Sequence, residues 1–266
     1  MASKDLDGFV AVVTGASSGL GRAIAEMAAE RGASAVIINY AANAAEAEET
    51  KRRVEAAGAK GVVVQGDVAD DEDCKRIAAA AAPFGRIDAL FNNAGQTTFA
   101  AHADMDAVSA DNFARIYAVN VIGPFQMIRA ARSLLEAASD PGAVVNTSSI
   151  AGVTGIGSSV PYAASKGALI TMTLSLARAL APKIRVNVIC PGYIDTPWFG
   201  RGMPPEAVDR LREGAKARSP LQLASKPEDI AGGAIFFASP AARHITGEAL
   251  LIDAGAHLGA ASMAMR

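Results

Sequence analysis

Seven short apolar runs, most of them rich in β-branched residues, recur along the chain, and helix-like stretches separate most of them. The runs are FVAVVT from Phe9, AVIIN from Ala35, GVVVQ from Gly61, DALFNN from Asp88, AVVNTSS from Ala143, IRVNVIC from Ile184 and ALLID from Ala249. The helix-like stretches include 20–31, 44–57, 71–82, 112–137 and 160–181. This alternation predicts an α/β fold, in which a doubly wound parallel sheet of about seven strands carries helices on both faces.

The size of the chain fits a single domain over residues 1–266 better than two small ones. Its hydrophobic content of 51%, with few aromatic residues, suits parallel strands buried between alanine-rich helices. The irregular piece is 193–220, which holds four prolines and a charged helical segment. We expect a substrate lid there, because α/β folds usually place such an excursion after the carboxyl end of a strand.

Charge and composition exclude several functional classes. The net charge of −2 gives no overall attraction to nucleic acid or to an anionic membrane. The two cysteines, Cys74 and Cys190, lack companion metal-ligand spacing, so we expect no metal site and two buried thiols in a reducing compartment. The N-terminal stretch lacks the apolar core of a signal peptide, and no apolar run approaches the length of a membrane span. We therefore expect a cytoplasmic protein.

A glycine-rich turn follows the first strand directly. The stretch TGASSGLG contains Gly15, Gly19 and Gly21. Glycine permits a tight turn and close approach of the backbone to a pyrophosphate, which then meets the free N–H groups of the next helix. The spacing differs from the G-x-G-x-x-G fingerprint, and the alternative is a turn that only permits tight packing.

The end of the second strand bears on the choice of cofactor. Tyr40 stands where an acidic residue would favour NAD, and no arginine follows it to bind the 2′-phosphate of NADP. Ser17, Ser18 and Asn43 could donate hydrogen bonds to a phosphate, so we favour NADP(H), with NAD(H) possible. At the end of the third strand, Asp67 could accept from an adenine amino group or could cap the following helix.

The fourth strand ends in NNAG, which comprises Asn92, Asn93, Ala94 and Gly95. We expect the two amides to tie neighbouring strand ends together. The small residues that follow would let a flat ring pass close to the backbone. Asn-rich turns are common, so this stretch alone is a weak indication of function.

Tyr162 and Lys166 lie four residues apart in YAASK and would share one face of a helix. Pro161 suits the start of that helix, with Ser158 or Ser159 as its cap. A tyrosine that works near neutral pH needs a pKa shift of roughly three units, or about 4 kcal/mol. One cation roughly 5 Å away supplies about 3 kcal/mol at an effective dielectric near 20. The alternative is a half-buried tyrosine beside a solvated lysine.

Further polar residues favour chemistry over that alternative. Ser148 and Ser149 end the fifth strand, so a serine hydroxyl and the Tyr162 hydroxyl could reach one carbonyl oxygen at the same edge of the sheet. Asn120 is a polar residue in an otherwise apolar predicted helix. Its alternative role is a hydrogen bond between helices.

With these residues assembled, the sequence resembles the short-chain dehydrogenase/reductase family in its compact form, including its 3-oxoacyl-(acyl-carrier-protein) reductase-like members. The resemblance covers essentially the whole chain, with TGASSGLG, NNAG, Asn120, Ser149, YAASK and PGYIDT in family order. It implies a Rossmann-type nucleotide-binding fold and an NAD(P)(H)-dependent oxidoreductase that acts on a ketone or secondary alcohol. It also implies a tetramer. The long helices 112–137 and 160–181 have more apolar surface than one sheet face needs to bury, and we expect them at an interface.

The resemblance implies a role for each residue of these motifs. Tyr162 would be the general acid or base, Lys166 would lower its pKa and bind the nicotinamide ribose, Ser149 would hold the substrate oxygen, and Asn120 would position a water in a proton relay. The residues implied to contact the cofactor are Gly15, Ser17, Gly19, Leu20, Asp67, Val68, Asn93, Ala94, Gly95, Pro191, Gly192, Ile194 and Thr196.

The substrate side offers mostly small, apolar or aromatic residues. We expect the segment from Ile150 to Ser159, together with Gln96, Thr97, Tyr193, Trp198 and Phe199, to line it. With only Arg201 as an obvious cation, this favours a neutral small-molecule ketone or alcohol, although Trp198 could simply pack the lid. A 3-oxoacyl-(acyl-carrier-protein) reductase and a non-catalytic NADP-sensing module stay open as alternatives.

Overall fold

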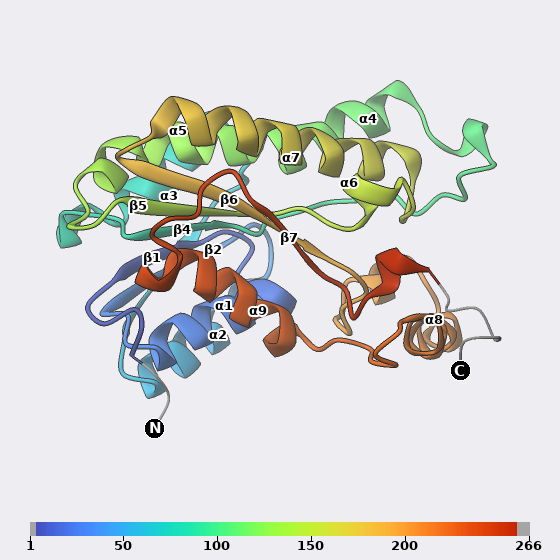
Figure 1. Cartoon of the computed structure of the whole chain (residues 1–266), viewed down its shortest axis with the longest axis horizontal. Helices are drawn as coiled ribbons and strands as arrows, with labels where there is room; N and C mark the ends of the chain where they lie inside the picture. Colours follow the sequence, from blue (N-terminus) through green and yellow to red (C-terminus); the bar gives the residue numbers. More distant parts are fainter. Residues whose placement is uncertain (1–3, 260–266) are drawn as a thin grey trace.

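A seven-stranded parallel sheet forms the centre of the computed structural model, which describes residues 4–259 apart from the side chain of Arg201. The strands run in the order β3-β2-β1-β4-β5-β6-β7, and every neighbouring pair is parallel. Their bounds are Val10–Val13 (β1), Ala35–Tyr40 (β2), Lys60–Gln65 (β3), Ala89–Asn92 (β4), Gly142–Thr147 (β5), Ile184–Pro191 (β6) and Ala249–Ile252 (β7). The predicted parallel sheet is confirmed (Figure 1).

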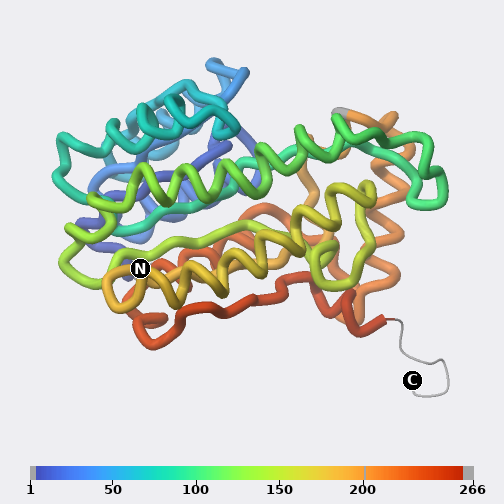
Figure 2. The backbone as a smooth tube through the Cα atoms, turned by 90° about the horizontal axis from the view of Figure 1, so that it is seen from above, coloured from blue at the N-terminus to red at the C-terminus, as the bar shows by residue number. Residues whose placement is uncertain are grey.

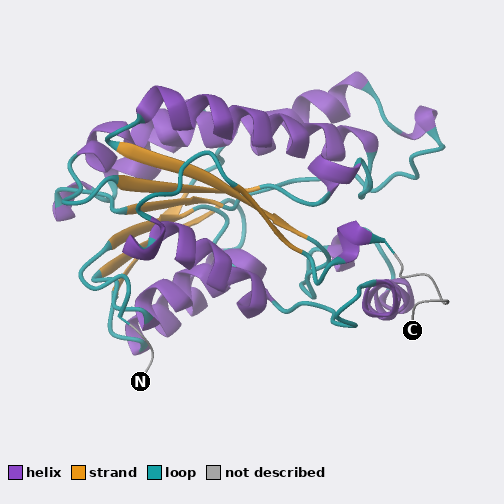
Figure 3. Ribbon diagram, in the orientation of Figure 1, coloured by secondary structure: helices purple, strands orange, loops and turns teal. Residues whose placement is uncertain are grey.

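Helices cover both faces of the sheet, as Figure 3 shows. One face carries α1 (Gly19–Glu30), α2 (Ala44–Ala56) and α9 (Pro227–Ala238). The other carries α3 (Asp71–Ala79), α5 (Gly123–Glu136) and α7 (Val160–Leu180). Because successive strand side chains point to opposite faces, each strand supplies residues to two separate cores.

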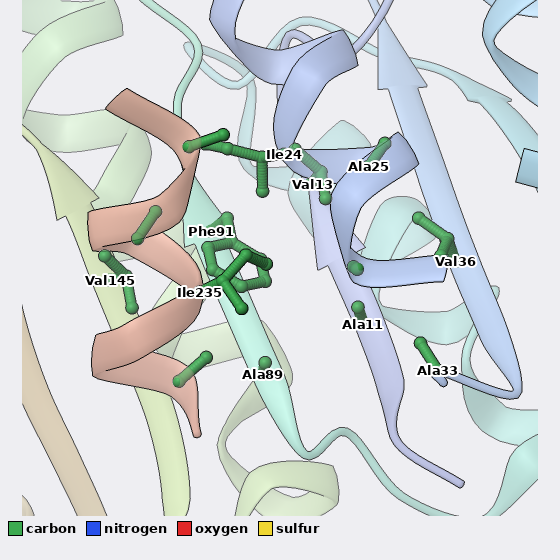
Figure 4. Close-up of a cluster of buried hydrophobic side chains, with 14 of the residues drawn as sticks. Ala11, Val13, Ile24, Ala25, Ala33, Val36, Ala89, Phe91, Val145 and Ile235 are labelled. Carbon is green, nitrogen blue, oxygen red and sulfur yellow. The ribbon is translucent and has the colours of Figure 1, made fainter. Parts of the chain in front are cut away.

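The core between the sheet and the pair α1 and α9 is built mainly from small and branched side chains, with two buried phenylalanine rings, Phe91 and Phe237. Phe91 of β4 lies there beside Ile235 of α9, and neither is more than 2% exposed (Figure 4). Ala11, Ala25 and Ala89 in the same cluster let the helices approach the strands closely. This packing fixes the strand ends from which the polar residues described below project.

The predicted helical stretch over 112–137 is observed at 110–136, but it is not a regular α-helix throughout. The structure has α4 (Ala110–Tyr117), a π-helical turn η3 (Ala118–Ile122) and then α5. Pro124 explains the π-helical turn, because proline lacks the N–H that an α-helix would direct to the carbonyl of Asn120, four residues earlier. The turn holds Asn120 fully buried. α4 and the π-helical turn pack against α7, as the course of the chain in Figure 2 illustrates.

The helix α7, which carries Tyr162 and Lys166, begins as predicted. Ser159 is the cap of α7, and its hydroxyl accepts a hydrogen bond from the backbone N–H of Tyr162 at 3.4 Å. Pro161 occupies the first turn. A short helix, α6 (Ala151–Thr154), links β5 to this segment and packs against α7.

The segment after β6 contains a helix of its own, α8 (Pro205–Arg218), which Figure 3 shows beyond one end of the strands. The charged stretch of the sequence is therefore helical, as expected. No helix within residues 4–259 is long and apolar enough to cross a membrane.

Candidate functional site

A cavity of about 740 Å³ runs along the carboxyl ends of the strands. It spans the position between β1 and β4 where the strand order reverses, which is where open α/β sheets bind ligands. It brings together most of the predicted site residues. The predicted residues that line it are Gly15, Ser17, Ser18, Gly19, Leu20, Asn43, Asp67, Val68, Asn93, Ala94, Gly95, Gln96, Thr97, Ser149, Tyr162, Lys166, Pro191, Gly192, Ile194, Thr196, Trp198 and Phe199.

Several predicted residues are absent from that lining. Tyr40 packs partly buried against the core beneath α1 and α9, so it does not stand at the cavity as expected. Ile150, with the rest of the predicted segment 150–159, and Tyr193 also lie outside it. Asn120 lies directly behind the cavity wall, since its Oδ1 would be 3.6 Å from a Cβ placed on Gly95.

The glycine turn meets the packing interpretation given to it, and its place at the cavity leaves phosphate binding as a prediction. Gly15 has a φ of +62°, and a Cβ there would lie 2.9 Å from the Cα of Ala94. A Cβ on Gly21 would lie 2.3 Å from the Gly15 oxygen, so these glycines are needed for packing. Ser18 precedes α1 without capping it through its side chain, and Gly19 faces the cavity. The first N–H groups of a helix have no partner within it and can bind an anion, so the start of α1 lies where the predicted pyrophosphate contact requires it.

Asn39, at the end of β2, is a residue that the sequence analysis did not assign. It is 1% exposed, its Oδ1 accepts from the Gly15 N–H at 3.2 Å and its Nδ2 donates to the Gly66 oxygen at 2.9 Å. It joins the glycine turn to the end of β3. Nearby, Asn43 caps α2 by accepting a hydrogen bond from the Glu46 N–H at 3.1 Å. Its side-chain oxygen is therefore already used within the protein.

Arg22 is a second unpredicted contributor to this end of the cavity. Its guanidinium donates to the Ser17 oxygen at 2.6 Å and pairs closely with Glu46. Arg22 therefore supports the turn from outside, and its charge is already balanced. No basic side chain among the described residues lines the cavity near Asn43.

Asp67 lies at the cavity and does not cap α3. Its Oδ1 accepts from the Ala69 N–H at 3.0 Å, whereas the cap of α3 is Asp70, which accepts from the Asp73 N–H. The capping interpretation of Asp67 is wrong. Its exposed carboxylate stands beside the buried Val68, in a position to accept a hydrogen bond from a ligand.

The amides after β4 tie strand ends together as predicted. Asn92 donates to the Asn146 Oδ1 at 2.9 Å, linking β4 to β5. Asn93 donates to the backbone oxygens of Thr14 and Gly15 at 3.1 and 3.2 Å, linking β4 to the glycine turn. These bonds hold the NNAG backbone at the centre of the cavity.

The end of β5 holds the Tyr162–Lys166 segment through three consecutive residues. The Lys166 Nζ donates to the Thr147 oxygen at 2.8 Å, and the Ser148 hydroxyl donates to the Lys166 backbone oxygen at 2.8 Å. The Ser149 hydroxyl interacts with that of Tyr162. These contacts aim the Ser149 and Tyr162 hydroxyls into one part of the cavity.

Gly152 of α6 completes this contact, because a Cβ there would lie 2.5 Å from the Lys166 carbonyl carbon. Only glycine lets α6 approach α7 this closely. The strand pattern alone did not separate Ser148 from Ser149, whereas the family resemblance singled out Ser149, and the structure gives the two serines different partners.

Burial dominates the protonation of both groups. It raises the pKa of Tyr162 to about 12, although the interaction with Ser149 opposes the rise, and it lowers the pKa of Lys166 to about 8. The expected lowering of the tyrosine pKa by Lys166 is not seen. The Lys166 Nζ lies 5.6 Å from the ring centroid, and loss of hydration outweighs its charge. Near neutral pH, Tyr162 therefore holds its proton firmly.

Asn120 is held by bonds on both sides of its amide. Its Oδ1 accepts from the Gln96 N–H at 2.8 Å, and its Nδ2 donates to the Gln96 oxygen and the Ser165 hydroxyl, each at 3.0 Å. The bond to Ser165 of α7 agrees with the predicted contact between helices. The bonds to Gln96 also fix the backbone next to Gly95.

Comparisons with known proteins find similar sequences over nearly the whole chain. Residues 15–257 match the family model described as enoyl-(acyl carrier protein) reductase. A protein of Streptomyces violaceoruber, named as ketoacyl reductase 2 of the granaticin polyketide synthase, is 38% identical over 97% of this chain and 100% of its own. L-rhamnose 1-dehydrogenase (NAD(P)(+)) of a Sphingomonas species is 37% identical over 96% of this chain and 98% of its own.

A solved structure supports the same assignment. The crystal structure of a short-chain dehydrogenase/reductase from Burkholderia xenovorans superposes with a TM-score of 0.86 at 39% identity. It covers 94% of this chain and 98% of its own. Fold and sequence similarity thus extend over nearly the whole molecule.

The shifted pKa of Lys166 predicts a pH-dependent contribution to stability. Its amine releases its proton near pH 8 when folded and near 10.5 when unfolded. The contribution of Lys166 to the free energy of unfolding is therefore fully present above pH 10.5, and it is lost as the pH falls through about 8. The free energy of unfolding of the wild type, relative to Lys166→Met, should rise by roughly 3 kcal/mol between pH 7 and 10.5. Urea unfolding across this range measures the difference.

Lys183→Met is the matched control, because Lys183 is exposed. Its stability should run parallel to that of the wild type. Parallel curves for Lys166→Met as well would contradict the assigned burial effect.

Proposed function

The chain belongs to the short-chain dehydrogenase/reductase family, and from this premise we propose that it transfers a hydride between NAD(P)(H) and a ketone or secondary alcohol with Tyr162 as general acid and base. The observation that carries the proposal is the hold of Thr147, Ser148 and Ser149 on the Tyr162–Lys166 segment. It sets two hydroxyls side by side in the cavity that the glycine turn also lines.

Tyr162 and Ser149 act on the substrate oxygen in this proposal. The raised pKa of Tyr162 keeps its proton in place near neutral pH, so it is suited to donate that proton as a carbonyl oxygen gains negative charge. The Ser149 hydroxyl donates a hydrogen bond to the same oxygen. In the oxidative direction, Tyr162 accepts the proton of the alcohol. The rate of oxidation should therefore increase as the pH rises.

Lys166 and Asn120 restore the proton. Lys166, whose pKa is lowered to about 8, can release or take up a proton near physiological pH. Asn120 lies in the π-helical turn next to Pro124, where its backbone carbonyl lacks the usual helical donor. We assign this carbonyl to a water that passes protons to Lys166.

The cavity fits a nicotinamide dinucleotide, which supplies or accepts the hydride at its ring when bound. The N–H groups that open α1 and the hydroxyls of Ser17 and Ser18 hold the phosphates, and Asp67 with Val68 receives the adenine. Asn93, Ala94 and Gly95 border the middle of the cofactor. Lys166 binds the nicotinamide ribose, and Pro191, Gly192, Ile194 and Thr196 cover the nicotinamide amide.

We favour NADP(H) over NAD(H). The end of β2 presents Ala41, Ala42 and Asn43 to the cavity, and no carboxylate among its described lining residues stands there to repel a 2′-phosphate. The side chains of Ser17, Ser18 and Asn43 are available as donors. The name of the relative from Sphingomonas includes both cofactors, which is consistent with a site that accepts either one.

The segment 193–220 acts as the substrate lid. Trp198 and Phe199 reach the cavity from it, and α8 packs against the short turn that carries Phe199. Tyr193 stacks on Phe199 from outside the cavity, with centroids 5.2 Å apart, and so supports the lid rather than the substrate.

Reduction of a 3-oxoacyl group on an acyl carrier protein is the second candidate, favoured by the ketoacyl reductase relative. An acidic carrier protein would require unpaired basic residues. Arg129 pairs closely with Asp71, and Arg132 pairs with Glu136 at 2.8 Å. The charges that the sequence offered for docking are thus already balanced, which favours a free small-molecule substrate.

We also propose a tetramer in which α4, α5 and α7 form an interface. Phe113, Ile122 and Phe125 are 37%, 47% and 43% exposed along α4, η3 and α5, and Leu174 of α7 is 44% exposed. Static light scattering should give four times the mass of the chain, because burying these side chains removes apolar surface from water. A monomer would contradict the proposal.

Replacing Tyr162 by phenylalanine should lower kcat about 1,000-fold while leaving the cofactor Kd within about twofold. Loss of the hydroxyl removes the proton donor but keeps the ring that packs beside Trp198. Steady-state reduction of a ketone panel, read at the nicotinamide absorbance, measures the first quantity, and a fluorescence titration measures the second. A variant that keeps most of its turnover would exclude Tyr162 as the acid. Binding by the wild type without any turnover would favour the NADP-sensing alternative.

Titration of the wild type with NADPH and NADH tests the cofactor assignment. We expect at least about fivefold tighter binding of NADPH, since the donors near Asn43 gain a phosphate partner. In Asn43→Asp the new carboxylate should reverse the preference through repulsion, with α2 still capped. Tighter binding of NADH by the wild type would overturn the preference.

A further inference from the structure

Aromatic side chains form the walls of the cavity beyond Tyr162. Trp198 faces the Tyr162 ring at a centroid distance of 6.4 Å and an angle of 51°. Phe99 and Phe199, which also line the cavity, lie 6.3 Å apart at 50°. Sequence reasoning missed Phe99, because nothing in QTTFA distinguishes a cavity residue from a loop residue.

These walls come from two parts of the chain that are packed together. Phe99 follows β4, whereas Trp198 and Phe199 belong to the lid. A Cβ on Gly202 of the lid would lie 2.3 Å from a ring carbon of Phe99, so the lid backbone rests directly on that ring. Tyr193 supports Phe199 from behind. The walls are therefore positioned before any substrate arrives, which lowers the entropic cost of binding.

Charge is scarce at this end of the cavity. Only Asp67, Tyr162 and Lys166 can ionise among the described lining residues. Asp67 follows β3, four strand positions from β5, or roughly 19 Å away at the usual spacing. The Lys166 Nζ is already bonded to the Thr147 oxygen. A carboxylate brought between the aromatic walls would lose hydration, and the one basic side chain among the described lining residues is this already bonded lysine.

Neutral hydrogen-bonding groups are present instead. Gln96 lines the cavity, and its bonds to Asn120 use only its backbone, which leaves the side-chain amide out of that contact. The Thr97 and Ser158 hydroxyls lie 2.5 Å apart at the border of the same region. They can meet a carbonyl, hydroxyl or ether group of a ligand without a change in charge.

We propose that the substrate is a neutral ketone or secondary alcohol whose reacting carbon belongs to a ring, held between Trp198 and Phe99. This inference rests on the proposed function and names its substrate class. A ring presents a flat apolar face to the aromatic walls and loses little internal freedom on binding. The Gln96 amide binds a second neutral polar group on the far side of the ring.

Three ketones of seven carbons test the class. They are 4-methylcyclohexanone, the open-chain 2-heptanone and the charged 4-oxocyclohexanecarboxylate. We expect kcat/KM for the neutral ring to exceed that of the chain about 10-fold and that of the carboxylate about 100-fold. Equal or better turnover of the chain or of the carboxylate would overturn the inference while leaving the oxidoreductase intact.

Variants test which residues cause the preference for a neutral ring. Trp198→Ala and Phe99→Ala should each raise KM for the neutral ring about 10-fold, change kcat by less than about threefold and leave the KM for 2-heptanone nearly unchanged. Trp198→Phe, which keeps a ring, should restore most of the loss. Val153→Ala is the control, since Val153 is 52% exposed on α6 and does not line the cavity. Equal effects of Trp198→Ala on ring and chain would exclude the proposed contact.

A binding measurement separates this inference from the reaction itself. Trp198 is the single tryptophan of the chain, so its fluorescence reports on the cavity. With oxidised cofactor present, 4-methylcyclohexanone should change the emission at concentrations at least about 10-fold below those of the carboxylate. If no ketone is reduced but this difference holds, the proposed function fails and the ligand class stands. If the neutral ring produces no change, or the carboxylate binds equally well, the ligand class fails.

Discussion

The hydrogen bonds between the end of β5 and the first turns of α7 set the position of every proposed reacting group. Thr147 holds the side chain of Lys166, Ser148 holds its backbone, and Ser149 meets Tyr162. Gly152 permits this contact by leaving no side chain between α6 and α7. Because β5 is an interior strand of a buried parallel sheet, paired on both sides, it gives the bonds a rigid base. A shift of α7 would separate the tyrosine from the serine and from the rest of the cavity at once.

Burial of this segment decides its electrostatics. Both pKa shifts favour the neutral form, because burial raises the pKa of Tyr162 and lowers the pKa of Lys166. A simple charge-pair estimate at an effective dielectric near 20 missed this result, because it left out the cost of removing each group from water. The consequence is a firmly protonated Tyr162, which suits proton donation in reduction. The aromatic walls and the scarcity of charge nearby belong to the same dry environment.

The sequence predicted the fold and most of the cavity for physical reasons that can be named. Strand and helix periodicity determined the sheet, and polar residues at strand ends had to meet at one edge, so Ser149, Asn93 and Asp67 were found. The π-helical turn around Asn120 was missed, although Pro124 carried the signal. Asn39, Phe99 and Arg22 could not be placed, since their roles depend on contacts between segments far apart in the chain. Tyr40 was misplaced because neither position nor residue type shows to which side a side chain turns at the end of a strand.

Direct hydride transfer is the central claim, and isotope transfer tests it most directly. A ketone would be reduced with nicotinamide cofactor that carries deuterium at C4, on either face in separate reactions, and the alcohol analysed by mass spectrometry. The proposed site predicts that deuterium reaches the carbinol carbon from one face only, because a cavity bounded by Tyr162, Ser149 and Trp198 admits one orientation. Alcohol without deuterium from both labelled cofactors, or no alcohol at all with any ketone, would contradict the account.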